Sequence, residues 1–168
     1  LATSTVGVAD IGNLHTAVWT GTEMIIWGGD DNVSGQAEPI GYRYNPTTDT
    51  WLATASSLPS VEPSIEHTAV WTGSEMLVWG GYDKWWNYPL GSGGRYNPAT
   101  DTWVAMTAYL PLSTIDHTAV WTGSEMILWG GEDGWGDYTL SSGTRYNPTT
   151  GQWTPITNTA APSARYGH

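Results

Sequence analysis

Several things are missing from this 168-residue chain, and each absence excludes a class of site or partner. It has no cysteine, which excludes disulfides, thiolate metal sites and cysteine nucleophiles. It has only 5 Lys and Arg against 16 Asp and Glu, for a formal net charge of −11. A surface this acidic repels phosphate groups, so neither nucleic acid nor an anionic membrane is an expected partner. No apolar run is long enough to cross a bilayer, and no segment resembles a signal peptide.

Motifs of common enzyme classes are also missing. The sequence contains no Gly-x-Ser-x-Gly elbow, no phosphate-binding glycine loop, no His-Glu-x-x-His and no Ser-x-Asp-x-Gly-x-Thr-Trp box. We therefore expect no enzymatic activity and no cofactor. The composition, poor in Lys and rich in Thr, Trp and Gly, is typical of an extracellular or cell-surface bacterial protein. Because the chain begins with Leu1, we also expect that an upstream part was removed or omitted.

What the chain does have is a repeat. Three nearly identical segments read HTAVWTGTEMIIWGG from His15, HTAVWTGSEMLVWGG from His67 and HTAVWTGSEMILWGG from His117. A fourth copy starts at His168, and the four histidines are separated by 52, 50 and 51 residues. Each segment is followed by a second one, which reads GYRYNPTTDTW, GGRYNPATDTW and GTRYNPTTGQW in turn. A period near fifty residues, made of short apolar runs and glycine turns, is typical of a radial β-repeat.

One repeat predicts four antiparallel strands. In the second copy, residues 67–71 form a β-branched and aromatic strand, and a turn follows with Gly73 at its first central position. Residues 76–79 lack polar alternation, so this strand is expected to be buried on both faces. Residues 94–96 form the third strand, Asn97-Pro98 begins a turn, and residues 102–104 open the fourth strand. Four such strands with no helix correspond to one propeller blade.

With these features the chain resembles the kelch repeat. The resemblance rests on the Gly-Gly doublet after the second strand, the Tyr-Asn-Pro-x-Thr-x-x-Trp segment and the His that opens the first strand. Two departures are Trp where kelch strands often have Tyr, and Asn-Pro where Asp-Pro is frequent. The resemblance implies an all-β, kelch-type β-propeller, in a family whose members mostly act as interaction platforms. The copper chemistry of galactose oxidase-like relatives does not carry over, because it needs a cysteine.

The repeat divides the chain into a connector and three blades. The predicted limits are 1–14 for the entering connector, 15–66 for blade 1, 67–116 for blade 2, and 117–168 for blade 3 with the start of the next repeat. Closed propellers have roughly four to eight blades, so three leave apolar sheet faces uncovered at both ends. We therefore expect either a piece of a longer propeller or association with further copies, two of which would make a six-bladed ring.

Residues that recur in every blade are interpreted as structural. The histidines are expected to bond the adjoining connector near the channel and to fix blade packing, since one ligand per blade suits zinc poorly. Arginines on the third strand are expected to pair across strands with glutamates that open the second, or to stack on Trp. These are Arg43, Arg95 and Arg145 with Glu23, Glu75 and Glu125. No metal site is expected, although the Asp-rich loops leave Ca²⁺ as an open alternative.

Binding is expected where the blades differ, in the loops between strands 2 and 3 and in the connectors between strands 4 and 1. In two of the blades, the loop between strands 2 and 3 carries aromatic rings at positions predicted to lie outside strands, with polar residues beside them. The candidate ligand-binding residues are Trp85, Trp86, Tyr88, Trp135, Tyr138, Asp83, Asn87, Asp133 and Asp137. An alternative is that these rings only cover their own loops. The recurrence of Asp31, Asp83 and Asp133 after the Gly-Gly doublets also favours a turn-capping role.

Three functions remain open at this stage. The first is a non-catalytic module for protein interaction or structural assembly, which binds a protein partner or further copies of itself through the variable loops. The second is carbohydrate binding by the loop Trp, Tyr and Asp side chains. The third is a fragment of a propeller enzyme whose active site lies outside this segment.

Overall fold

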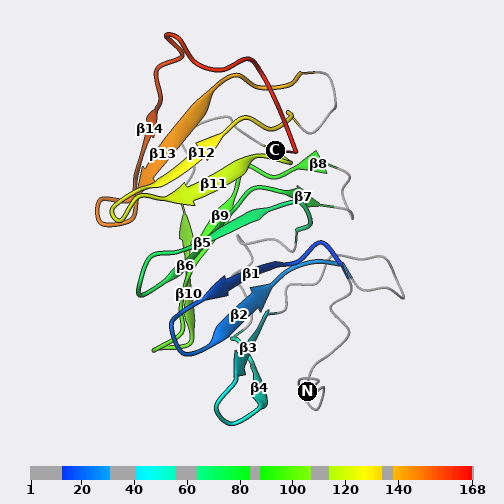
Figure 1. The fold of residues 1–168 in the computed structure, drawn as a ribbon, viewed down its shortest axis with the longest axis vertical. Helices are drawn as coiled ribbons and strands as arrows, with labels where there is room; N and C mark the ends of the chain where they lie inside the picture. The colour runs from blue at the N-terminus through cyan, green and yellow to red at the C-terminus, as the bar shows by residue number, and fades with distance from the viewer. Residues whose placement is uncertain are drawn as a thin grey trace.

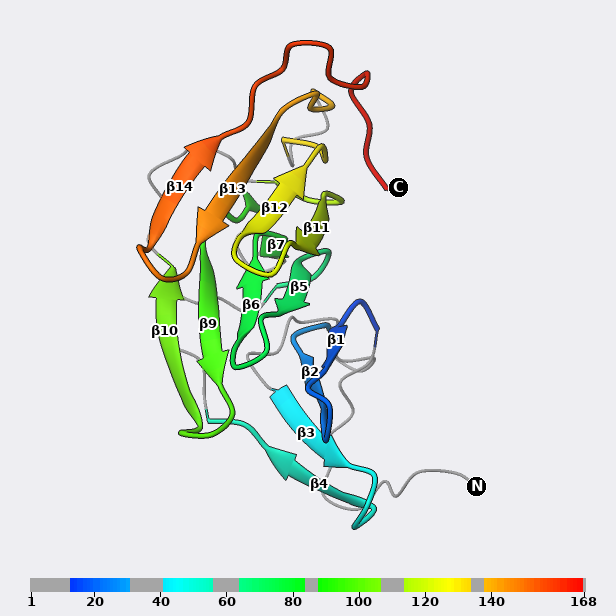
Figure 2. The same cartoon turned by 60° about the vertical axis from the view of Figure 1, so that its left-hand side comes forward.

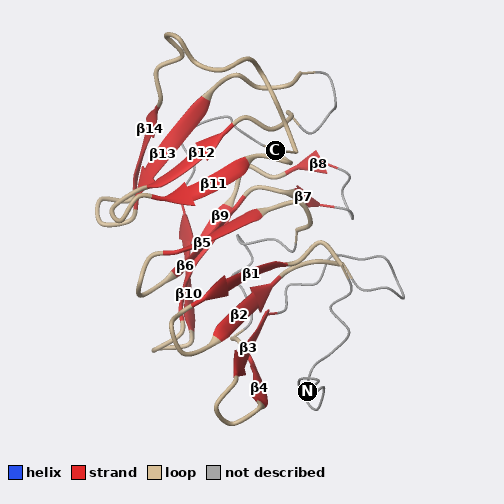
Figure 3. Cartoon of the chain, viewed as in Figure 1, coloured by secondary structure: helices blue, strands red, loops and turns tan. Residues whose placement is uncertain are grey.

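The structure is a computed structural model that describes residues 13–30, 41–55, 64–83, 88–106, 114–133 and 138–167. The described residues form strands, turns and loops without any helix (Figure 3). Three four-stranded antiparallel sheets are stacked side by side and fan out along the chain (Figure 1). This confirms an all-β fold of four-stranded antiparallel blades that form part of a ring.

Each sheet is one blade, with its strands paired in chain order. Blade 1 contains β1 (Thr16–Trp19), β2 (Met24–Trp27), β3 (Gly41–Asn45) and β4 (Thr50–Ala53). Blade 2 contains β5 (Thr68–Trp71), β6 (Met76–Trp79), β9 (Gly93–Asn97) and β10 (Thr102–Met106). Blade 3 contains β11 (Thr118–Trp121), β12 (Met126–Trp129), β13 (Gly143–Asn147) and β14 (Gln152–Pro155). Of the first strands, β5 contacts both β1 and β11 along one side of the arc, and β4, β10 and β14 lie on the opposite side (Figure 2). The blade limits given above, which include residues outside the described ones, stay predictions.

The first hairpin of each blade closes as the sequence predicts. In blade 2, Gly73 has a φ of 102°, which places it in the region that favours glycine. The Thr72 amide donates to the Glu75 carbonyl at 2.9 Å, while the Thr72 hydroxyl oxygen accepts the Glu75 amide at 2.9 Å. The threonine side chain therefore replaces one of the backbone bonds of the turn, which explains why Thr precedes each of these glycines.

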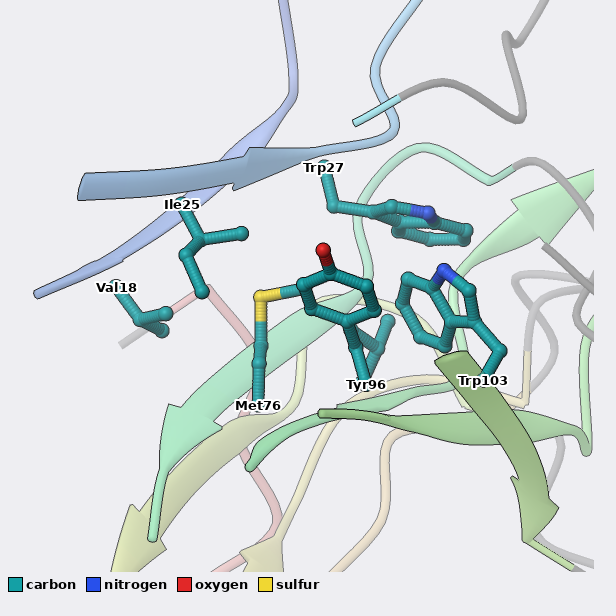
Figure 4. Packing of buried hydrophobic residues seen from close by; sticks show 7 residues of the cluster. Val18, Ile25, Trp27, Met76, Tyr96 and Trp103 are labelled. Carbon is teal, nitrogen blue, oxygen red and sulfur yellow. The ribbon is translucent and has the colours of Figure 1, made fainter. Parts of the chain in front are cut away.

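Two apolar cores lie between the blades. The first joins Val18, Ile25 and Trp27 of blade 1 to Met76, Val78, Tyr96 and Trp103 of blade 2. Figure 4 shows side chains of both blades meeting there. The second joins Val70, Leu77, Trp79 and Met106 of blade 2 to Met126, Leu128 and Tyr146 of blade 3. Every residue of β6 is buried, as its lack of polar alternation predicts, because blade 2 has a neighbour on both faces.

Gly81, the second glycine of the blade 2 doublet, lies between the connector that enters its blade and the next connector. Gly81 has a φ of 96°, and its amide donates to the Thr114 carbonyl at 3.0 Å. A Cβ atom at this position would lie 2.5 Å from the Ile65 carbonyl oxygen and 2.9 Å from the Cβ of His67. The doublet is therefore needed for both backbone conformation and close approach.

One feature of the fold departs from the sequence prediction. The 2–3 loop of blade 2 contains two further short strands, β7 (Tyr82–Asp83) and β8 (Tyr88–Pro89), which pair with each other. Tyr88 was expected to lie outside any strand, and that expectation is wrong. The pair lies beyond the four-stranded blade, where a short strand ending in proline can still form because no further strand needs its amide.

Candidate interaction surfaces

The repeated histidines link each blade to the one before it. His67 Nε2 lies 2.8 Å from Thr16 Oγ1 in blade 1, and His117 Nε2 lies 2.7 Å from Thr68 Oγ1 in blade 2. Burial lowers the pKa of both imidazoles to about 4, so both are neutral at pH 7. The expected role in blade packing is confirmed, although the closest side-chain partner is a hydroxyl of the preceding blade.

The repeated arginines form a second set of links between blades. Arg43 donates from Nε to Glu23 at 3.0 Å, as the predicted cross-strand pair requires, and from Nη1 to the Pro98 carbonyl of blade 2 at 2.9 Å. Burial disfavours the charge of Arg43, but hydrogen bonds to Tyr96 and Glu23 raise its pKa above the ordinary value.

Arg95 repeats this arrangement one blade further along. It donates to Glu75 at 3.1 Å and to the Pro148 carbonyl of blade 3 at 2.7 Å. Arg43 and Arg95 therefore each pair within their own blade and reach the 3–4 turn of the next one, a link between blades that the sequence analysis missed.

Beside these arginines, grooves open between neighbouring blades. The groove between blades 1 and 2 has a volume of about 450 Å³ and is lined by Arg43, Trp71 and Asn97, among others. The matching groove between blades 2 and 3 has a volume of about 390 Å³ and is lined by Arg95, Trp121 and Asn147, among others. Both lie at the end of the blades where the turns hardly vary in sequence, so we interpret them as products of blade packing.

Blade 3 has an open face, which we define by Val120, Ile127 and Trp129. These residues occupy the positions that Val18, Ile25 and Trp27 fill in blade 1, and Val70, Leu77 and Trp79 in blade 2. Val120 is 50% exposed, whereas Val18 and Val70 are each 8% exposed. Ile127 and Trp129 are half-buried, whereas their counterparts are buried. The same apolar face is thus covered in two blades and uncovered in the third, as the sequence predicts.

The opposite side of blade 1 is open as well, and we define this open face by Trp19, Met24, Tyr44 and Trp51. Trp19 is 54% exposed, and the other three are half-buried. Their counterparts Met76, Tyr96 and Trp103 in blade 2 are buried in the first core. Each end of the arc therefore presents one half of an interface that occurs twice inside it.

Four of the nine candidate ligand-binding residues lie within the described part of the chain. Asp83 is buried in β7, and Tyr88 is half-buried in β8. Asp133 Oδ1 lies 3.4 Å from the Tyr138 amide nitrogen, and the Asp133 amide donates to the Tyr138 carbonyl, which fits the turn-capping interpretation. Tyr138 is 71% exposed and is the most accessible large apolar residue described. Trp85, Trp86, Asn87, Trp135 and Asp137 lie outside the described residues, and so does Asp31.

Two kinds of feature are absent from the described ranges. No three His, Asp or Glu side chains there are grouped so that they could hold a metal ion. Nor do these residues include a helix long and apolar enough to cross a membrane.

Comparison with known proteins then assigns the family. Residues 14–168 match the family model of the KLHDC2/KLHL20/DRC7 Kelch-repeats domain. The chain belongs to the kelch-repeat family. Kelch-repeat domains generally mediate protein–protein interactions and are generally non-catalytic. No curated protein matches the chain.

A solved structure titled "Structure of YjhT" has the same fold as this kelch chain. The TM-score is 0.75 at 16% sequence identity, with 92% of this chain and 54% of that one covered. At this identity the similarity shows the fold alone. The chain spans about half the length of the structure that it matches.

Proposed function

We propose that this kelch chain is a non-catalytic module for protein interaction and structural assembly, and that its open blade faces are completed by further copies of itself. The observation that carries the proposal is the exposure of Val120 at a position that is buried in both other blades. Uncovered apolar patches on a rigid frame favour association. Two copies of a three-blade arc would give six blades, which lies within the range of closed propellers.

The solution mass of residues 1–168 tests this proposal. Sedimentation equilibrium should show a dimer, and Val120→Asp should shift the chain to monomer because it places a charge on the open face. The control is Val104→Asp, since Val104 is 52% exposed but lies on blade 2, which already has both neighbours. A wild-type chain that stays monomeric at every concentration tested would contradict the proposal.

A second candidate is recognition through the variable loops, of a protein or of a carbohydrate, and the exposure of Tyr138 favours it. The accessible Tyr138 ring offers a stacking surface, and the Asp133 carboxylate, which lies 3.4 Å from the Tyr138 backbone amide nitrogen, is a hydrogen-bond acceptor on the same loop. We expect Tyr138→Ala to abolish signals on a glycan array while Tyr166→Ala, at another exposed tyrosine, preserves them. The loop Trp residues Trp86 and Trp135 would be tested in the same way. An array without any signal rejects the carbohydrate variant of this candidate.

We also propose an extracellular or cell-surface location. The support is the composition, which is poor in Lys and rich in Thr, Trp and Gly, together with the acidic balance. Surface labelling of intact cells with an impermeant reagent tests this location.

A further inference from the structure

The two grooves between blades arise from blade packing, and that packing gives both of them the same lining. Each groove has an arginine–glutamate pair from the earlier blade, with the tryptophan that ends the first strand and the asparagine of the 3–4 turn from the later blade. These residues are Arg43, Glu23, Trp71 and Asn97 in the first groove, and Arg95, Glu75, Trp121 and Asn147 in the second. The same combination of side chains therefore occurs at both blade junctions that the structure describes.

The tryptophan of each groove has two environments. Trp71 packs against the first core and Trp121 against the second, so packing fixes both rings in place. Both rings are only half-buried, and each lines a groove. A fixed and partly accessible indole offers a surface on which the apolar side of a ligand can stack.

The arginine–glutamate pair makes the lining polar without giving it a net charge. Arg95 donates from Nε and from Nη2 to the Glu75 carboxylate, at 3.1 Å in both cases. The two side chains are 24% and 17% exposed, so the groove gives access to the pair. A guanidinium has five N–H donors and a carboxylate roughly four acceptor sites, so the pair can still donate and accept after it has formed. Because the charges cancel, this lining suits a neutral ligand that hydrogen-bonds in both directions.

The asparagines and one serine add further polar groups. The Asn97 side-chain oxygen accepts the Ala99 amide, and the Asn147 oxygen accepts the Thr149 amide, each at 2.9 Å. With this oxygen used inside the turn, each asparagine offers a ligand its NH₂ group, which is a donor. Ser74 is exposed in the turn between β5 and β6 and lines both grooves.

We propose that each of these two grooves binds a neutral saccharide. A sugar ring has C–H faces that stack on an indole, and hydroxyls that donate and accept at once, which matches a tryptophan beside a neutralised ion pair. The volumes of about 450 and 390 Å³ lie in the range of small-molecule sites. An anionic sugar is disfavoured, since the chain carries a formal net charge of −11.

The two sites are distinct from the surfaces considered under the proposed function. They lie between blades 1 and 2 and between blades 2 and 3, so they do not depend on what covers the open faces at the ends of the arc. They are lined by the 1–2 and 3–4 turns, whereas Tyr138 belongs to a 2–3 loop at the other end of its blade.

A glycan array followed by calorimetry tests the proposal. The array carries neutral, sialylated and sulfated glycans, and we expect signals from neutral ones. Isothermal titration with the neutral glycan that gives the strongest signal should then show two ligands bound per chain. This number is counted per chain, so it does not change if the protein also forms dimers.

Three matched arginine variants assign the bound glycan to the grooves. Ala99 lines the first groove and Thr149 the second, and both are exposed at equivalent positions of a 3–4 turn. A long charged side chain there should obstruct one groove, so Ala99→Arg and Thr149→Arg should each leave one ligand per chain, and the double variant none. Thr47→Arg is the control, since Thr47 is the exposed equivalent in blade 1 and lines neither groove. It should keep two ligands per chain. Circular dichroism checks that all variants keep the wild-type fold.

Three outcomes overturn the proposal. The first is an array with no signal from any neutral glycan. The second is binding to sialylated or sulfated glycans alone. The third is a folded Ala99→Arg, Thr149→Arg double variant that still binds two ligands per chain; if Tyr138→Ala then removes this binding, the glycan is held by the variable loops instead.

Discussion

His117 Nε2 in blade 3 lies 2.7 Å from Thr68 Oγ1 in blade 2, and Thr68 opens β5, the strand that contacts the first strands of both neighbouring blades. The pair has an equivalent one blade earlier, between His67 and Thr16. A buried imidazole that bonds a hydroxyl of the preceding blade fixes the spacing between two sheets that share no backbone ladder. Blade packing is therefore sensitive to the charge of these histidines and to the presence of the hydroxyls.

The low pKa of these two buried histidines predicts that the protein loses stability in acid. Burial holds the pKa of His67 and His117 at about 4, below the ordinary 6.5, so the unfolded chain binds protons that the folded chain excludes. The free energy of unfolding should fall as the pH drops from 6.5 to 4, by up to roughly 3 kcal/mol per histidine. Urea unfolding at several pH values measures this. The double variant His67→Gln, His117→Gln should have a flatter profile, because it removes both buried imidazoles.

Removing the hydroxyl of Thr68 should destabilise the chain. Thr68→Val keeps the shape of the side chain but leaves Nε2 of His117 buried without this partner. We expect a loss of about 1–3 kcal/mol in the free energy of unfolding. Thr149→Val is the control, because Thr149 is exposed in the 3–4 turn of blade 3 and should change stability by less than about 0.5 kcal/mol. Equal effects of the two variants would show that the hydroxyl of Thr68 is dispensable.

Two glycines with similar backbone angles should respond differently to alanine. Gly81 and Gly73 have φ values of 96° and 102°, so both alanine variants incur a conformational penalty of about 1–2 kcal/mol. At Gly81 the new Cβ would also meet the Ile65 carbonyl oxygen at 2.5 Å, whereas at Gly73 nothing lies within 4 Å. Thermal unfolding should therefore show a clearly lower melting temperature for Gly81→Ala. If Gly73→Ala proves equally damaging, close approach of the backbone is not the reason for the doublet.

The tryptophans at the end of the second strands should differ in their contribution to stability. Trp27→Ala removes a buried ring from the first core and should cost about 3–5 kcal/mol. Trp129→Ala acts on the open face of blade 3, where the ring is half-buried, and should cost less. Urea unfolding at low protein concentration compares them without association. A Trp129 variant as unstable as the Trp27 variant would mean that this face is already covered within one chain.

Most of the fold could be predicted from the sequence because a blade is encoded locally. The strand at residues 76–79 is an uninterrupted apolar run between glycine turns, and the structure gives it the same bounds. The cross-strand pairing of Arg43 with Glu23 could also be predicted, since antiparallel neighbours bring these two positions together.

The contacts between blades were harder to predict. The second partner of Arg43 is the backbone carbonyl of Pro98, and a carbonyl carries no sequence signal. Thr16 was not identified as the partner of His67, because a threonine in a strand is equally explained by β-propensity. The β7–β8 pair was missed because Tyr88-Pro89 has the composition of a loop.

The uneven coverage of the blades has a consequence for local opening. Blade 2 is packed on both sides, whereas blades 1 and 3 are each packed on one. In a chain whose units touch only their neighbours, stability is close to a sum over units and contacts, so the end sheets fray before the central one. Amide hydrogens of β6 and β9 should therefore exchange with deuterium last, and those of β1 to β4 and β11 to β14 earlier. Closing the ring would slow exchange at both ends together.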